Sequence, residues 1–144
     1  MSNLKIKITS LRIKSPYGYI LNTKAVVSNF INRARNGKRL ALKGNINKKQ
    51  SFTFVEDIGA SCEKIFKQNL SGIFDCIGND EISVKNLAKL INSIFKKHQT
   101  IKIDKSFNSI NKNKLKKNIN SLSTPLKVGL FKIFKSENNL EIFK

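Results

Sequence analysis

Hydrophobic and polar positions alternate most clearly between Leu40 and Asp57, in the stretch LALKGNINKKQSFTFVED. Apolar residues at every second position are typical of half-buried strands, and Gly44 with the Asn and Lys residues after it marks a polar loop. The stretch therefore predicts two short strands around a loop. A carboxylate accepts free N–H groups at the start of a helix, so Asp57 is predicted to cap the helix that follows.

Apolar residues recur at helical spacing in four further stretches, which predict helices over 22–36, 56–68, 84–97 and 124–135. We expect Asn22 or Thr23 to cap the first helix and Gly37 to end it. Ser83 is expected to cap the third. The second helix is predicted to bury one stripe of apolar side chains: Ile58, Cys62, Ile65 and Phe66.

Three other apolar runs predict strands over 4–14, 73–77 and 101–103. The first is expected to end in a turn over 15–18, because proline cannot continue a central ladder. Residues 105–123 are polar and predict a loop with one short helix near 112–118. A chain of 144 residues forms about one domain.

Charge and cysteine content exclude several classes of protein. The net charge is +19, but nearly all of it comes from lysine, and specific nucleic-acid recognition favours arginine. We therefore expect no specific nucleic-acid partner, only weak attraction to polyanions at low salt. Cys62 and Cys76 lack metal-ligand spacing and are predicted to be buried, reduced thiols. No apolar run has the length of a membrane helix or a signal peptide, so we expect no membrane partner and a cytoplasmic location.

Five motifs together resemble one family. Leu40 to Asp57 resembles its frame Leu-x-Ile-x-Gly-x-Gly followed by Arg-Asp-Phe-Val-Tyr-Val-Asp-Asp, with Ile46 in place of the second glycine and Gln50 in place of the arginine. The other motifs, in chain order, are Leu11-Arg12-Ile13 with Pro16-Tyr17-Gly18, Val26-Val27 with Phe30-Ile31, Gly72 to Asp75 with Glu81 to Ala88, and Pro125 with Gly129-Leu130. In this order they resemble the C-terminal part of NAD-dependent epimerase/dehydratases, the extended short-chain dehydrogenases that act on nucleotide sugars.

The resemblance implies an α/β fold: the C-terminal portion of an extended Rossmann-type short-chain dehydrogenase, with short strands and amphipathic helices of the substrate-binding domain. Residues 1–144 would form a single partial domain. Residues 1–18 would be the last part of the nucleotide-binding sheet, and 19–144 the substrate-binding region with one returning sheet strand near 72–77. The intact family uses NAD(P) and includes isomerases of polysaccharide biosynthesis.

The resemblance also implies roles for single residues. Ser15, Pro16 and Tyr17 would border the cofactor and the reacting sugar. Asn22, Leu40, Ala41, Lys43 and Gln50 would contact the nucleotide sugar, with Gln50 at the diphosphate. Gln50 stands where many members have arginine, and an amide does not replace the charged guanidinium fork. The basic cluster Arg33, Arg35, Lys38 and Arg39 is either a solvated helix end or an aid in holding the diphosphate.

Two parts of the family's chemistry are missing from the sequence. No two glycines have the G-x-G spacing that lets backbone approach a pyrophosphate. Neither tyrosine is followed by lysine four residues later, so the proton-transferring Tyr-x-x-x-Lys pair is absent. We therefore predict no catalytic residue, no metal site and no tight NAD(P) binding by this chain alone.

These absences favour a nucleotide-sugar-binding part that is truncated or split and inactive by itself. Its expected partners are a nucleotide sugar and either a separately encoded N-terminal half or a second copy of the chain. The alternative is a noncatalytic binding or complementing module that attracts polyanions through its lysines.

Overall fold

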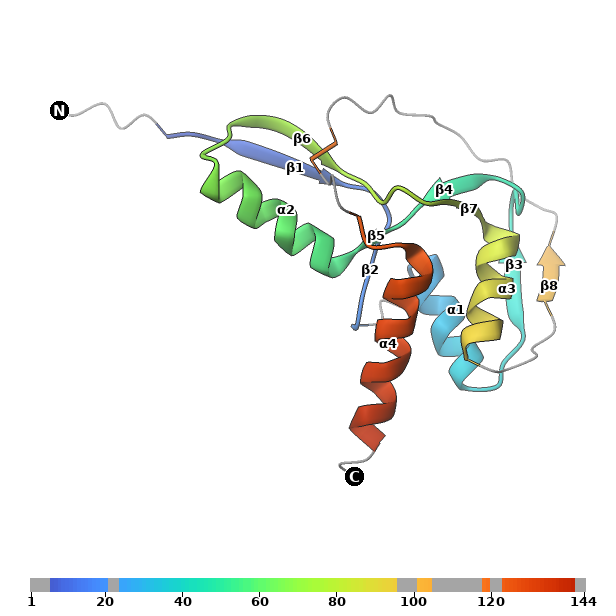
Figure 1. Ribbon diagram of the computed structural model, residues 1–144. Helices are drawn as coiled ribbons and strands as arrows, with labels where there is room; N and C mark the ends of the chain where they lie inside the picture. Colours follow the sequence, from blue (N-terminus) through green and yellow to red (C-terminus); the bar gives the residue numbers. More distant parts are fainter. Residues whose placement is uncertain (1–5, 21–23, 96–100, 105–117, 120–122, 142–144) are drawn as a thin grey trace.

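The computed structural model describes residues 6–20, 24–95, 101–104, 118–119 and 123–141 (Figure 1). Helices and strands mix along the chain, which confirms the predicted α/β class. In chain order the elements are β1 (Thr9–Ile13), β2 (Pro16–Tyr17), α1 (Val26–Arg35), β3 (Leu40–Lys43), β4 (Lys49–Ser51), β5 (Thr53–Phe54), α2 (Val55–Lys67), β6 (Gly72–Cys76), β7 (Glu81–Ser83), α3 (Val84–Ile94), β8 (Ile101–Asp104) and α4 (Leu126–Glu141).

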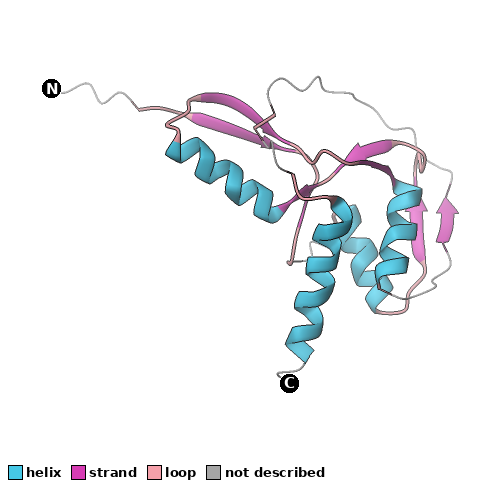
Figure 2. Cartoon of the chain, viewed as in Figure 1, coloured by secondary structure: helices cyan, strands magenta, loops and turns pink. Residues whose placement is uncertain are grey.

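The strands form four two-stranded pairs (Figure 2). β1 pairs with β6, β2 with β5, and β3 with β8, all in parallel, whereas β4 and β7 are antiparallel. The strands predicted over 73–77 and 101–103 are present as β6 and β8. The assignment of β1 and β6 to a nucleotide-binding sheet stays a prediction.

The chain around the first strand is more broken than its alternation predicts. Within the described residues the strand begins only at Thr9, and residues 6–8 are irregular. The predicted turn over 15–18 reduces to Ser15, whose φ is 45°, and Pro16–Tyr17 then forms β2. Leu40 to Asp57 likewise holds three short strands instead of two, because Phe52 interrupts the second.

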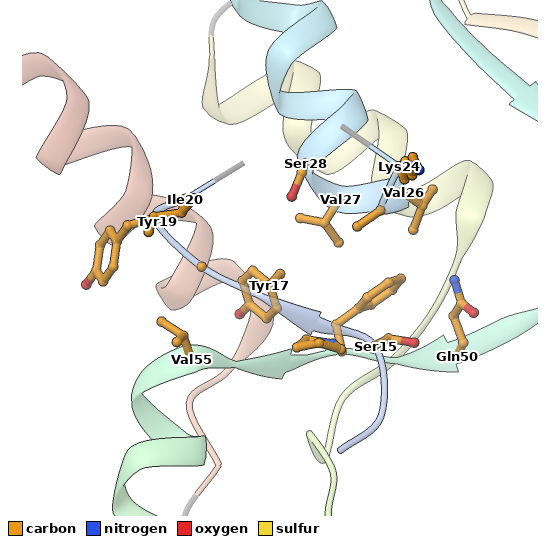
Figure 3. A pocket seen from close by; sticks show the side chains of 14 residues that line it. Ser15, Tyr17, Tyr19, Ile20, Lys24, Val26, Val27, Ser28, Gln50 and Val55 are labelled. Atoms are coloured by element: carbon orange, nitrogen blue, oxygen red, sulfur yellow. The ribbon is translucent and has the colours of Figure 1, made fainter. Parts of the chain in front are cut away.

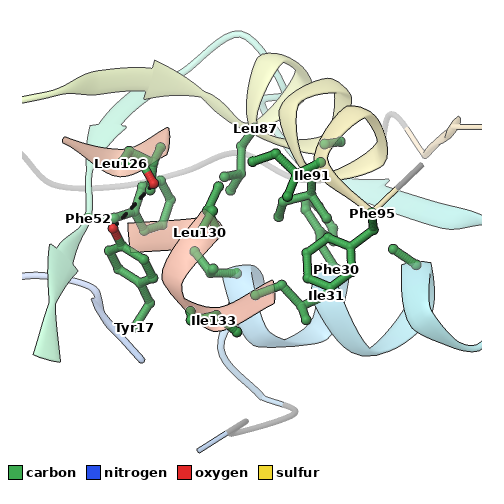
Figure 4. Close-up of a cluster of buried hydrophobic side chains, with 14 of the residues drawn as sticks. Tyr17, Phe30, Ile31, Phe52, Leu87, Ile91, Phe95, Leu126, Leu130 and Ile133 are labelled. Carbon is green, nitrogen blue, oxygen red and sulfur yellow. Dashed lines mark hydrogen bonds between the residues drawn. The ribbon is translucent and has the colours of Figure 1, made fainter. Parts of the chain in front are cut away.

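One hydrophobic core joins α1, α3 and α4 with β3 and β5 (Figure 4). The fully buried side chains of this core include Ile31, Leu40, Leu42, Phe54, Leu87, Ile91, Leu130 and Ile133.

The ends of two helices test the predicted caps. α1 begins after Ala25, which has no capping oxygen, so the predicted cap by Asn22 or Thr23 is wrong. Gly37 ends α1 as predicted, with φ of 64° and a hydrogen bond from its N–H to Ala34. Ser83 caps α3 as predicted, accepting a hydrogen bond from the N–H of Asn86 at 3.2 Å.

α2 does not bury the predicted apolar stripe. Cys62 and Phe66 are exposed, and Ile58 and Ile65 are only half-buried. The buried positions of α2 are Asp57 and Ser61. The prediction of a buried Cys62 is therefore wrong, whereas Cys76 is buried as expected. The stripe exists, but the described elements of this chain cover it only at Ile58 and Ile65, and there only in part.

Asp57 has a different role from the predicted cap. Phe54 is the N-cap of α2 and makes no side-chain cap, and Asp57 lies inside the first turn. Its carboxylate accepts hydrogen bonds from the N–H and the hydroxyl of Thr124, at 2.9 Å and 2.6 Å. Asp80 similarly accepts from the N–H of Leu126 at 2.8 Å. These two carboxylates fix the start of α4 against the rest of the chain.

The short helix predicted near 112–118 lies almost wholly outside the described residues.

Candidate functional site

An open cavity of about 920 Å³ lies between β2 and the beginning of α1 (Figure 3). Three segments line it: residues 15–20, residues 24–28, and the side chains of Gln50, Phe52 and Val55. Most of the lining is apolar or aromatic, and the polar groups are few. Apolar walls with a small number of placed polar groups are typical of small-molecule sites.

Buried Thr53 joins the strands below the cavity. Its hydroxyl donates to the carbonyl of Lys14 at 2.7 Å, and its N–H donates to the carbonyl of Ser15 at 3.2 Å. The same hydroxyl accepts from the N–H of Gly78 at 3.3 Å. A side chain at Gly78 would lie 1.9 Å from the carbonyl oxygen of Phe52, so only glycine allows this approach. Ser15 is thereby held beside the segment that carries Gln50 and Phe52.

Tyr17 forms a wall of the cavity, but its hydroxyl serves the core. The hydroxyl donates to the carbonyl of Leu126 at 3.5 Å, which the dashed line in Figure 4 marks. Burial, followed by the negative charges of Asp57 and Asp80, raises the pKa of Tyr17 well above the usual range of tyrosine. The phenol therefore stays neutral at physiological pH, and it is unsuited to proton transfer.

The start of α1 opens onto the cavity. Ala25 is the N-cap, and its side chain supplies no acceptor for the first N–H groups of the helix. Lys24, which also lines the cavity, adds a positive charge at this end. The N–H groups at the start of a helix and the helix dipole both favour a bound anion.

The basic cluster at the other end of α1 does not line the cavity. At a rise of about 1.5 Å per residue, Arg35 lies about 10 Å farther along the helix than Ser28. The Nε of Arg33 donates to the carbonyl of Arg39 at 2.6 Å, which closes the helix end. The cluster is therefore better explained as a solvated helix end than as part of this cavity.

The predicted site residues divide into two groups. Ser15, Pro16, Tyr17 and Gln50 line the same cavity, although the sequence separates them by more than thirty positions. Leu40, Ala41 and Lys43 lie on β3, and Leu40 and Ala41 do not line the cavity. The side chain of Leu40 is fully buried, and that of Ala41 is half-buried. Asn22 and the side chain of Lys43 lie outside the described part of the chain.

Sequence reasoning missed a polar contact at the rim of the cavity. The hydroxyl of Tyr19 donates to Oε1 of Glu56 at 2.5 Å, and Glu56 also forms an ion pair with Lys132. The hydrogen bonds from Lys132 and then Tyr19 lower the pKa of Glu56, and the bond to Glu56 raises the pKa of Tyr19. Tyr19 and Lys132 are far apart in sequence, so no local pattern indicated this contact.

Within the described residues, no three His, Cys, Asp or Glu side chains gather in a way that could hold a metal ion. His98 lies outside those residues. The helices that the structure describes include none with the length and hydrophobicity required to span a bilayer.

The sequence matches no protein-family model. No curated protein matches it either.

Comparison with solved structures gives many matches. The UDP-N-acetylglucosamine 4-epimerase of Methanobrevibacter ruminantium M1 has a TM-score of 0.78 at 16% identity, over 94% of this chain and 48% of that chain. The UDP-glucose 4-epimerase of Thermotoga maritima, solved with UDP-glucose, has a TM-score of 0.76 at 18% identity, over 96% of this chain and 48% of that chain. The UDP-glucuronic acid 4-epimerase of Bacillus cereus, solved with NAD, has a TM-score of 0.74 at 18% identity, over 96% of this chain and 47% of that chain.

This chain thus spans about half the length of these structures. At such low identity the likeness is one of fold, and on that level it confirms the predicted resemblance. The chain has the fold of about half of a nucleotide-sugar epimerase of the NAD-dependent, Rossmann-type class.

Proposed function

We propose that the chain is the C-terminal, nucleotide-sugar-binding part of an NAD-dependent sugar epimerase or dehydratase. The observation that carries this proposal is the cavity, which brings Ser15, Pro16, Tyr17 and Gln50 together beside the start of α1. These are four of the residues for which the family resemblance implies cofactor or substrate contacts. The structures of similar fold include epimerases solved with UDP-glucose and with NAD.

The chemistry of the cavity is compatible with such a ligand. A diphosphate carries negative charge, which the start of α1 and Lys24 favour. The amide of Gln50 can donate a hydrogen bond to a phosphate oxygen, although without the charge of a guanidinium. Ile20, Val55 and the ring of Tyr19, which line the cavity and are exposed, offer apolar surface to a sugar face or a base. Leu40 would contribute to a base site only through its backbone, because its side chain is buried.

NAD does not fit the residues of this chain well enough for a catalytic role here. The glycine-rich turn for its pyrophosphate is absent, and the hydroxyl of Tyr17 is held by Leu126 in the core. In the proposed whole enzyme, bound NAD would accept and return a hydride from the sugar. In this proposal, the chain's own residues bind and orient the sugar nucleotide, and no proton-transfer step is assigned to them.

Thermal unfolding with and without UDP-, GDP-, CDP- and dTDP-sugars tests the proposal. A ligand that binds only the folded chain raises the midpoint, and a concentration of about 100 times Kd adds roughly 2.7 kcal/mol to the free energy of unfolding. Such a gain moves the midpoint of a domain of this size by several degrees. We expect a shift with one nucleotide class and none with the free sugar.

A matched pair of variants places the binding site. Gln50→Ala is expected to abolish most of the ligand-induced shift, because its amide lines the cavity. Gln68→Ala changes the same residue type at the exposed C-cap of α2 and is expected to leave the shift unchanged. Equal shifts in both variants, or no shift with any nucleotide sugar, would contradict the proposal.

A noncatalytic complementing module remains a second candidate. The exposed apolar side chains of β1, β6 and α2 favour it, because such surface usually marks an interaction site. The two functions are compatible if the same chain binds a sugar nucleotide and a protein partner.

A further inference from the structure

Residues 18–20, which we call the wall segment, form one end of the cavity. They follow β2 outside any helix or strand, and none of their backbone groups forms a hydrogen bond with another described residue. Figure 3 shows Tyr19 and Ile20 at the end of the cavity that lies opposite Gln50. Ile20 is 94% exposed and buries almost no surface. The position of the wall segment therefore depends on the contacts of Gly18 and Tyr19.

These contacts all lead to one short stretch of chain, where β5 passes into α2. The hydroxyl of Tyr19 donates to Oε1 of Glu56 at 2.5 Å, and its ring meets the ring of Phe54 edge-on, with 5.6 Å between the ring centres. Gly18 packs against Val55 so closely that a Cβ at this position would lie 2.6 Å from Cγ1 of Val55. Among them, the bond to Glu56 is the polar and directional contact.

Glu56 is held from its other side by α4. Its Oε2 forms an ion pair with the ammonium group of Lys132, and this ammonium group also lies 5.5 Å from the centre of the Phe54 ring. The start of α4 is itself fixed by the two carboxylates described above. A carboxylate with a charged partner at each oxygen's side keeps one orientation and accepts a stronger hydrogen bond than a freely rotating one. Neither Glu56 nor Lys132 lines the cavity, so α4 reaches the cavity only through Tyr19.

An ordinary surface ion pair would have a different consequence. The side chains of Glu56 and Lys132 are both 44% exposed, and exposed ion pairs contribute little to the free energy of unfolding. If the pair had no further role, its removal would leave the wall segment where it is. If it supports Tyr19, its removal releases the wall segment while the stability of the fold hardly changes.

We infer that Glu56 is a positioning residue of the cavity: with Lys132 behind it, its carboxylate holds Tyr19 and keeps the wall segment in place before any ligand enters. A site that is ordered in advance binds more tightly than one that must be ordered by its ligand. α4 thereby influences binding, although none of its described residues lines the cavity. That the ligand is a nucleotide sugar rests on the proposed function, but the support of the wall segment does not.

Backbone ¹⁵N relaxation tests the inference without a ligand. Order parameters are about 0.85 for a rigid backbone and below about 0.6 for a flexible one. We expect rigid values at Gly18, Tyr19 and Ile20 in the unchanged chain, and values below about 0.6 at these three residues in Glu56→Ala. The thermal midpoint of Glu56→Ala is expected to stay nearly the same, because the pair is exposed.

Matched variants assign the effect to this set of contacts. Tyr19→Phe keeps the ring and removes the donor, so it is expected to release the wall segment as Glu56→Ala does, and the double variant no further. Lys132→Met removes the charge on α4 and is expected to lower the order parameters in part. Glu63→Ala removes a carboxylate from the exposed ion pair with Lys67 on the same helix and is expected to leave the wall segment rigid.

Ligand affinity is the second readout. The probe is the nucleotide sugar that raises the thermal midpoint most among the UDP-, GDP-, CDP- and dTDP-sugars. We expect Glu56→Ala to raise its Kd by about fivefold, the effect of one hydrogen bond, and Tyr19→Phe to add nothing in the double variant. Glu63→Ala is expected to leave the Kd unchanged.

Three results would overturn the inference. The first is a wall segment that stays rigid in Glu56→Ala, or that is already flexible in the unchanged chain. The second is a loss of order and of stability throughout Glu56→Ala, since this would identify a general structural role. The third is an unchanged Kd in Glu56→Ala where a nucleotide sugar binds. Release of the wall segment in a chain that binds no nucleotide sugar would refute the proposed function alone and leave Glu56 as a positioning residue.

Discussion

Replacing Asp57 distinguishes two possible roles of this residue. It either joins two distant segments of the chain or caps one helix locally. Asp57 is only 6% exposed, and both of its carboxylate oxygens accept hydrogen bonds from Thr124. A cap would stabilise α2 alone. The observed geometry instead ties the first turn of α2 to the residue that precedes Pro125 and α4.

The expected magnitude follows from these two bonds. Hydrogen bonds to a charged group contribute about 1.5–3 kcal/mol each to the free energy of unfolding, whereas loss of a cap costs about 1 kcal/mol. Asp57→Ala is therefore expected to cost about 3 kcal/mol. Thr124→Val removes one donor and is expected to cost about 1.5 kcal/mol. Because the bonds are shared, the double variant should be less destabilised than the sum of both changes, by about 1.5 kcal/mol.

Equilibrium urea unfolding of the unchanged chain, the two single variants and the double variant measures this coupling. An unchanged slope of the free energy of unfolding against urea concentration shows that unfolding exposes the same surface in each protein. Glu63→Ala, an exposed acidic change on the same helix, is the control and is expected to have little effect. The reasoning would be refuted if the effects of the two single changes simply added and Asp57→Ala cost only about 1 kcal/mol. Asp57 would then act as a helix cap and would not join α2 to α4.

Further changes test other parts of the fold. Gly129→Ala is expected to destabilise the fold by about 1–3 kcal/mol in thermal unfolding, because the new Cβ would lie 2.2 Å from the hydroxyl of Tyr17. The new Cβ in Gly59→Ala would meet no atom within 4 Å, so this change is expected to stabilise α2 by up to about 1 kcal/mol. Ser83→Ala should cost about 1 kcal/mol in the same assay through loss of the α3 cap, and a change within error would contradict that role. The raised pKa of Tyr17 means that its contribution to stability is complete below the unfolded pKa of about 10 and is lost as the pH rises further. In a Tyr19→Phe background, tyrosinate absorbance should therefore appear only with unfolding, and earlier ionisation would show that Tyr17 is accessible.

The sequence predicted the parts of the fold that depend on local chemistry. The helical spacing of apolar residues located α1, α3 and α4, and the cap at Ser83 and the stop at Gly37 were also correct. β7 was missed, and β2 was predicted as a turn, because strands of two or three residues are too short to show alternation. Their positions depend on partners far away in the chain, such as Thr53 for Pro16.

The error at α2 has a different cause. Periodicity indicates that Ile58, Cys62, Ile65 and Phe66 share a stripe, but it does not indicate that this chain covers the stripe. At the cavity, the sequence led to Ser15 and Gln50 through the family resemblance, and the structure places both on one lining. The contact of Glu56 with Tyr19 and Lys132 could not be predicted, since no local pattern links three distant segments.

The four strand pairs have a consequence for how the chain folds. Each pair joins segments far apart in sequence; the Arg12 and Asp75 that face each other across β1 and β6 are 63 residues apart. Closing such long loops costs entropy before any ladder contact forms, so folding rates fall as the mean sequence separation of contacts rises. The helices have no such requirement and can form early. We therefore expect refolding to be slow for a chain of this length, with helical signal recovered before the sheets lock their register. During that interval the apolar strands remain open to a chaperone.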